Sequence, residues 1–228
     1  MDPALDQAFK AVFDNRIERL RELLAGGLAL DSTGPYGNTL LGNAAQNASP
    51  ASVELLLSLG ADPNQRIFCR SPVSKRVEAA FTPLMYARVA EVAKTLIAAG
   101  SDVNARSETG FTPLMRASRD GSCEQVELLL NHGARIDDVD EAGNSALMLA
   151  ALGGNVDIVE TLVRHGANLN FRQRRRSGRK AATALGLAKD ACSMFESFPA
   201  DQLKPEAQDI IEGLRRTIRV LESSGATN

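Results

Sequence analysis

The sequence predicts an all-α fold, a solenoid of about six helix pairs with projecting hairpin fingers, two of them elongated. Three observations predict it. A short segment that begins with threonine or serine occurs five times in the 228 residues. Each copy is followed by an apolar helical stripe that closes on a glycine, and polar, turn-rich segments separate successive pairs. Because one such pair cannot bury both of its apolar faces, neighbouring pairs must stack into a continuous core.

The first helix of each pair is predicted to begin after residue 39, 82, 112, 145 or 183. The clearest copy starts with Thr112 and Pro113. A threonine hydroxyl can cap a helix by accepting a backbone N–H, and proline fits the first helical position. Leu114 and Ala117, three residues apart, then face one side of the helix.

The second helix of each pair carries apolar residues at the i, i+3, i+4 spacing, as at Val126, Leu129 and Leu130. Such a stripe faces a core. A glycine follows each of these helices and can supply the left-handed conformation of a helix C-terminus; the internal copies are Gly60, Gly100, Gly133 and Gly166.

The chain is predicted to be a single domain over residues 1–228, in which repeats 32–64, 65–104, 105–137 and 138–170 lie between two capping pairs. Residues 1–31 form the N-terminal cap, with degenerate helices at 5–13 and 16–25. Residues 171–228 form the C-terminal cap, because the ends of a solenoid need a polar outer face.

The C-terminal pair is longer than the others. Thr183 to Gly225 spans forty-two positions, against twenty-one in a regular repeat. We expect a lengthened first helix, a turn near Pro199 and a closing helix from about Pro205. An apolar stripe on the first of these helices is interpreted as an end cap over the open core or, alternatively, as a hook for a partner; it comprises Leu187, Ala191, Met194, Phe195 and Phe198.

Other departures from the repeat length mark candidate binding loops. The regular fingers span eight positions, but Asn64 to Thr82 spans eighteen and Asn170 to Thr183 spans thirteen. Insertions in solenoids often lie on the binding face, and both of these are basic. The first contains Arg66, Arg70, Lys75 and Arg76, and the second contains Arg174, Arg175 and Arg176. In addition, Thr82 to Gly100 spans only eighteen positions, which predicts a shortened turn near Val89.

The repeated segments resemble the ankyrin-repeat family over nearly the whole chain. The resemblance is carried by segments such as Thr112-Pro113-Leu114-Met115-Arg116-Ala117 and Leu129-Leu130-Asn131-His132-Gly133-Ala134. In that family the finger tips and the exposed side of the first helices form a concave surface that binds proteins. Carried onto this sequence, the resemblance implies partner contacts at Tyr36, Asn38, Arg106, Glu108, Phe111, Arg119, Glu141 and Asn144, in addition to the basic loop residues.

Among these candidates Tyr36, Phe111, Arg106 and Arg119 are the predicted anchors, since tyrosine and arginine dominate interface energies. The arginine run at 174–176 has three interpretations: a solvated loop, a contact with an acidic protein surface, or nuclear targeting and nucleic-acid contact. A net charge of −2 and only ten aromatic residues disfavour nucleic acid.

No catalytic constellation, cofactor motif or metal-ligand cluster is found, so the chain is predicted not to be an enzyme. His132 and His165 precede the terminal glycines of two successive repeats, where an imidazole can meet helix carbonyls. Cys69, Cys123 and Cys192 form no CxxC pair, which argues against a zinc site or a disulfide framework.

The sequence therefore predicts a non-catalytic protein-binding module, monomeric when alone, whose partner has an acidic surface. An inhibitor, immunity or regulatory protein of an enzyme is the leading hypothesis. The alternatives are a scaffold or host-directed effector and, less favoured, a nucleic-acid-binding or nuclear protein. A cytoplasmic location is expected, or a periplasmic or exported one if a leader peptide has been removed.

Overall fold

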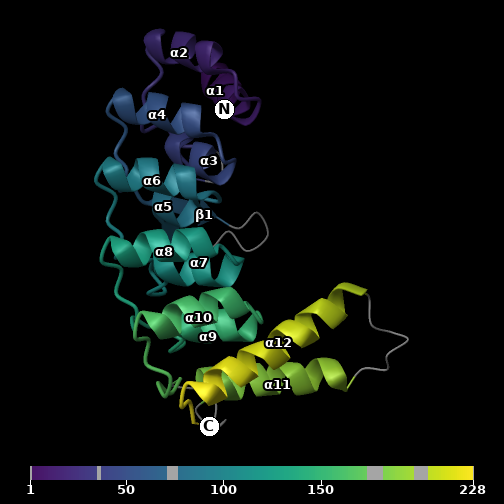
Figure 1. The fold of residues 1–228 in the computed structure, drawn as a ribbon. Helices are drawn as coiled ribbons and strands as arrows, with labels where there is room; N and C mark the ends of the chain where they lie inside the picture. Colours follow the sequence, from purple (N-terminus) through teal and green to yellow (C-terminus); the bar gives the residue numbers. More distant parts are fainter. Residues whose placement is uncertain (1, 35–36, 71–76, 174–181, 198–204, 228) are drawn as a thin grey trace. The chain divides into compact units, whose positions relative to one another are not determined.

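The computed structural model describes residues 2–34, 37–70, 77–173, 182–197 and 205–227. Within these ranges the regular secondary structure is almost entirely helical, and the chain divides into two compact units, Met1–Thr109 and Gly110–Asn228 (Figure 1). The predicted all-α fold of paired, stacked helices is confirmed in each unit.

Unit 1 contains three helix pairs: α1 (Pro3–Phe13) with α2 (Ile17–Ala25), α3 (Leu40–Gln46) with α4 (Pro50–Ser58), and α5 (Pro83–Tyr86) with α6 (Ala90–Ala98). The first helices, α1, α3 and α5, pack in succession as an inner layer, and α2, α4 and α6 form an outer layer. Side chains from both layers are fully buried between them, among them Val12, Leu20, Leu40, Leu56 and Leu96. The degenerate N-terminal pair is thus confirmed as helical.

Unit 2 repeats this arrangement with α7 (Pro113–Asp120) and α8 (Cys123–Asn131), α9 (Ala146–Leu152) and α10 (Val156–Arg164), and α11 (Ala184–Glu196) and α12 (Pro205–Ser223). The inner helix α9 lies between α7 and α11, and the outer helix α10 lies between α8 and α12. The core of unit 2 contains apolar side chains of the outer helices that have no exposed surface: Val126, Val159, Leu162, Leu214 and Leu221.

The structure contains both predicted helix signals, the threonine or serine N-cap of the inner helices and the glycine that ends the outer helices. The side-chain oxygens of Thr39, Thr112, Ser145 and Thr183 each accept the backbone N–H three residues on, at 3.1–3.3 Å. At the other end, Gly133 has φ of 82°, and Ala134 donates its N–H to the Leu129 carbonyl at 3.0 Å. Gly60, Gly100 and Gly166 end their helices in the same way, by a left-handed glycine and a 6→1 hydrogen bond.

The short repeat differs from the sequence-based expectation. Between inner and outer helix, α5 and α6 are joined by residues 87–89, whereas α7 and α8 are joined by residues 121–122. The turn is therefore not shortened, and that prediction is wrong. The missing residues come from the inner helix, because α5 has four residues and α7 has eight.

The elongated second finger is an antiparallel hairpin of β1 (Ile67–Arg70) and β2 (Val77–Phe81). Ile67 pairs with Phe81 and Phe68 with Ala80, and the register shifts after Cys69. The finger therefore leads directly from the end of one repeat to Thr82, the N-cap of α5.

The lengthened C-terminal pair is also confirmed: α11 has thirteen residues and α12 has nineteen. Leu187 and Ala191 are buried and Phe195 is half-buried, but Met194 is 56% exposed, so the described part of the predicted end-cap stripe covers the core only in part. Phe198 and the predicted turn at Pro199 lie outside the described residues. No helix in the described part of the chain is long and apolar enough to cross a membrane.

Candidate protein-binding surface

The inner helix α7 exposes one charged face because its other side is fixed in the core. Leu114, Met115, Ala117 and Ser118 are buried, which leaves Arg116, Arg119 and Asp120 toward solvent at the end of the helix. These three residues and Phe111 are called here the Arg119 cluster.

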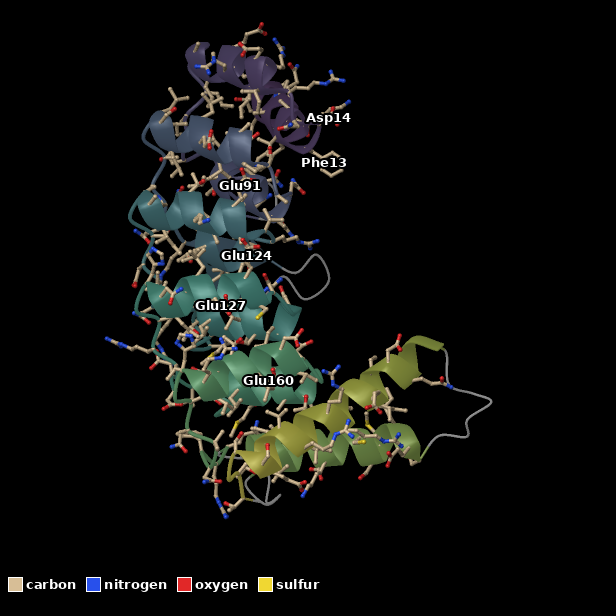
Figure 2. All side chains as sticks on the ribbon, viewed as in Figure 1. Phe13, Asp14, Glu91, Glu124, Glu127 and Glu160 are labelled. Carbon is tan, nitrogen blue, oxygen red and sulfur yellow. The ribbon has the colours of Figure 1, made fainter. Side chains whose placement is uncertain are left out.

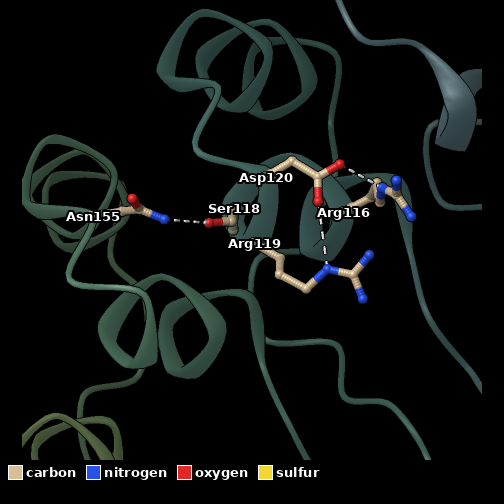
Figure 3. A network of polar contacts seen from close by, with 5 residues as sticks. All are labelled: Arg116, Ser118, Arg119, Asp120 and Asn155. Carbon is tan, nitrogen blue, oxygen red and sulfur yellow. Dashed lines mark hydrogen bonds and ion pairs between the residues drawn. The ribbon is translucent and has the colours of Figure 1, made fainter. Parts of the chain in front are cut away.

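Ion pairs orient the two guanidinium groups of the Arg119 cluster (Figure 3). Arg116 Nε lies 2.6 Å from Asp120 Oδ2, and Arg119 Nε lies 3.4 Å from Asp120 Oδ1. The Arg119 guanidinium carbon also lies 5.1 Å from the centre of the Phe111 ring, within reach of a cation–π interaction. Solvent-exposed pairs of this kind contribute only about 0–1 kcal/mol to stability. Their main effect is to hold two cations in fixed positions around one carboxylate.

The neighbouring helix α9 continues this surface with apolar side chains. Leu152 occupies the same position in its repeat as Arg119, thirty-three residues later, and is 49% exposed. A hydrogen bond of 3.2 Å from Asn155 Nδ2 to the Ser118 carbonyl joins the N-cap of α10 to α7 (Figure 3). Unit 2 therefore presents a fixed cation beside an exposed leucine, a combination suited to a protein ligand.

Three of the predicted partner residues share a structural position that the sequence analysis missed. Asn38, Phe111 and Asn144 each stand immediately before a helix-capping threonine or serine. Asn144 donates to Asp140 Oδ2 at 2.9 Å and accepts from Gln173 Nε2 at 2.5 Å, so its amide stabilises the finger. The Phe111 ring is only 8% exposed. All three residues directly precede the N-cap of an inner helix. This shared position could have shown from the sequence that they face inward.

Several other predicted residues lie on the exposed fingers. Arg66, Arg106 and Glu108 are exposed in unit 1, and Arg66 Nη2 donates to the Arg106 carbonyl at 3.2 Å, which ties the two fingers together. Glu141 is exposed in unit 2. These positions are accessible to a partner, as a contact role requires.

The remaining predicted contacts lie where the structure gives no side-chain position. Tyr36, Lys75, Arg76 and Arg174, Arg175 and Arg176 are outside the described residues, and the side chain of Arg70 is likewise not described. The base of the last basic finger is described: Gln173 donates its N–H to the Ala182 carbonyl at 3.0 Å. This bond brings together the two ends of the segment that carries the arginine run.

One exposed aromatic residue was absent from the sequence-based candidates. Phe13 ends α1 and is 71% exposed, and its side chain extends away from the ribbon (Figure 2). Asn15, two residues later, has φ of 54°, which matches the left-handed Gly121 after α7. Phe13 therefore stands at the position of Arg119 in its own repeat, which aligning the inner helices would have shown.

The histidine and cysteine contacts are of a structural kind. His132 Nδ1 lies 2.8 Å from the Leu128 carbonyl, the helix-end contact that the sequence predicts. Burial raises the pKa of the Cys192 thiol above its ordinary value, and the Glu196 carboxylate 3.5 Å away adds to the shift. Among the described residues no group of three His, Cys, Asp or Glu side chains could hold a metal ion.

The comparison with protein families places the chain in a class of repeat proteins. Residues 84–173 match a model of three ankyrin repeats, and residues 36–67 match a model of a single ankyrin repeat. The two matches cover more than half of the sequence, so the chain belongs to the ankyrin-repeat family. No curated protein shows a significant match. Ankyrin repeats are protein–protein interaction modules, and this chain is such a module.

Proposed function

We propose that this chain is a non-catalytic binding protein that holds a partner protein and thereby inhibits or regulates it. The binding surface comprises the exposed side of the inner helices and the basic fingers. The observation that carries this proposal is the Arg119 cluster, because two cations share one carboxylate there and leave a net positive charge. Arginine is among the residue types that are enriched at the energetic centre of protein interfaces.

The proposed partner has an acidic surface. The outer helices of unit 2 expose Glu124, Glu127 and Glu160, and α6 of unit 1 exposes Glu91 (Figure 2). An acidic partner is repelled by these carboxylates and attracted by the Arg119 cluster and the basic fingers. Because α10 also exposes Arg164, which lies 3.9 Å from Glu127, this charge difference favours the inner helices without closing the outer layer to such a partner.

Within this surface the proposed contacts differ in kind. Because the Phe111 ring is nearly covered, we assign the partner contact to the Arg119 guanidinium stacked near it, with Phe111 as its support. Asn144 holds its finger through Asp140 and Gln173. As rim contacts we assign the exposed Arg66, Arg106 and Glu108 in unit 1 and the exposed Glu141 in unit 2. Rim charges mostly govern association rate and its salt dependence.

Affinity capture from the native cell extract, followed by mass spectrometry, tests the proposal. The bait is the full chain, compared with Arg119→Ala and with a matched control, Arg164→Ala, on the outer helix α10. Arg119 and Arg164 side chains are 49% and 64% exposed, so both changes remove an accessible guanidinium. We expect a protein that the wild type and Arg164→Ala retain and Arg119→Ala loses.

The captured protein then decides its role. An enzyme whose activity falls on binding supports inhibition, whereas a bound protein with unchanged activity favours a scaffold or effector. Capture of nucleic acid, or equal capture by the Arg119→Ala variant, would contradict the proposed surface.

A further inference from the structure

An apolar hollow of about 400 Å³ lies in unit 1 between the C-terminal ends of α2 and α4, helices seen in Figure 1. It is lined by Arg21, Leu24, Ala25, Leu28, Leu30 and Leu59. A second hollow of about 400 Å³ adjoins it, shares Leu30, and is lined by polar groups that include Asp31 and Asp62. The two hollows together are called here the Leu59 groove.

The leucines of the Leu59 groove depart from the repeat pattern of this chain. Leu28 follows the helix-ending Gly27, whereas Ala61, Ala134 and Ala167 follow the corresponding glycines. Leu59 stands at the helix C-cap where α8 has His132 and α10 has His165. Leu59 is 45% exposed. At these two positions, large apolar side chains therefore replace the small or polar ones of other repeats. They leave apolar surface exposed, and its burial by a ligand is favourable.

The acidic end of the groove differs from the other repeats in its contacts and not in residue type, because the equivalent acid Asp137 accepts the Asn168 N–H at 2.9 Å. Residues at the start of the other fingers use their side chains to hold the next repeat: Asn64 Oδ1 accepts the Asp102 N–H at 2.8 Å, and Asn170 Oδ1 accepts the Thr227 N–H at 2.7 Å. Asp31 occupies this position in the first finger, but its carboxylate accepts no hydrogen bond from the described part of the chain. Asp62, which corresponds to Asp102, lines the same hollow, and its Oδ1 accepts the Asn64 N–H at 2.8 Å.

The charges of the groove are separated along its length. Asp31 and Asp62 lie at one end, and no cationic side chain lines that hollow. Arg21 lies at the other end, where its Nε is 3.8 Å from Glu18 Oε2. Two carboxylates near each other and without a cation favour an incoming ammonium or guanidinium group. A leucine-lined hollow directly beside them favours a large apolar side chain.

We propose that the Leu59 groove is a second interaction site, which binds a partner peptide presenting a large apolar residue next to a lysine or arginine. The apolar side chain occupies the hollow between Leu28 and Leu59, and the cation pairs with Asp31 and Asp62. This ligand is opposite in charge to the acidic partner of the inner helices. A module with both sites therefore bridges two proteins of different charge.

The test uses a library of random twelve-residue peptides displayed on phage, selected on the full chain. The matched control is the triple variant Leu28→Ala, Asp31→Asn, Leu59→His, which restores the residues that other repeats of this chain carry and should fold normally. We expect selected peptides with an apolar residue adjacent to Lys or Arg. Their synthetic forms should bind the triple variant at least about tenfold more weakly in fluorescence anisotropy.

A second measurement begins with the wild-type chain. In amide NMR spectra of the wild-type chain, saturating peptide should shift the resonances of residues 28–31 and 59–62 more than those of α7. Asp31→Asn alone should weaken binding of the selected peptide. When the Lys or Arg of that peptide is replaced by Gln, Asp31→Asn should no longer weaken binding. These results would support the site.

Other outcomes overturn it. Selection that yields no peptide sensitive to the triple variant, or shifts confined to other residues, excludes the proposed ligand. A concentration-dependent dimer that the triple variant abolishes, measured by sedimentation, would assign the groove to a second copy of the chain instead.

Discussion

The α5–α6 pair of unit 1 and the α7–α8 pair of unit 2 begin with the same four residues, Thr-Pro-Leu-Met, yet they fold differently. Helix α7 runs for eight residues to a left-handed glycine, Gly121. Helix α5 runs for four residues and ends at Ala87 in an extended conformation. The Thr112 hydroxyl caps its helix, whereas Thr82 Oγ1 is buried and has no hydrogen-bond partner in the described part of the chain.

This difference teaches that a helix start signal fixes a position but not a length. The outer helices α6 and α8 both have nine residues and pack in the core, so each inner helix must end where the chain can still reach its outer partner. The α5–α6 repeat has three fewer residues than the α7–α8 repeat, and α5 lacks the last turn that α7 has. In α7 this last turn carries Arg119 and Asp120. A binding surface of this kind therefore requires a full-length inner helix.

The largest effect is expected from removing the end of unit 2. Truncation after residue 182 deletes α11 and α12, which cover α9 and α10. Fully buried side chains such as Leu162 would then face solvent. We expect loss of cooperative unfolding and of solubility, measured by urea denaturation and size-exclusion chromatography. A soluble monomer of residues 1–182 with unchanged melting would contradict the need for this cap.

The next largest effect is expected from core substitutions, which should destabilise the two compared pairs by different amounts. Leu129→Ala in α8 is expected to destabilise by about 2–5 kcal/mol through the cavity it leaves. Leu96 is the equivalent, fully buried residue of α6. Because α5 has only half as many residues as α7, we expect Leu96→Ala to lie at the lower end of that range. Denaturant midpoints at constant m-value measure both, and a larger loss for Leu96→Ala would break the comparison.

The capping threonines give a sharper test with a smaller effect. Thr112→Ala should cost about 0.5–2 kcal/mol, because it removes a cap hydrogen bond. Thr82→Ala should be close to neutral, since its hydroxyl is buried without a partner in the described residues and its removal leaves no donor unsatisfied. Thermal melts of the two variants decide this; equal losses would show that Thr82 also caps its helix in solution.

The smallest effect on stability is expected in the Arg119 cluster. Arg119→Ala removes one exposed ion pair and should change the free energy of unfolding by less than about 1 kcal/mol. Its effect on partner binding should be much larger and should fall mainly on dissociation. Surface plasmon resonance with the captured partner measures this, and a variant that unfolds easily would mean that the cluster is structural.

Most of the fold and only part of the site could be predicted. Thr112 and Gly133 carry their conformational preferences locally, so the starts of the inner helices and the ends of the outer helices follow from sequence. Phe111 and Asn144 were expected to contact a partner, but one is covered and the other holds Asp140 and Gln173. Their environment depends on residues of neighbouring segments, which periodicity does not reveal.

The sequence by itself determined the class of fold, the family, the starts of the inner helices and the ends of the outer helices, because capping, hydrophobic periodicity and glycine conformation act within a few residues. The tertiary structure decided which residues remain accessible. It exposed Leu152 and Phe13, and it placed Leu28 and Leu59 around one groove. Such groupings depend on how successive repeats stack, and stacking joins side chains that are about thirty residues apart in the chain.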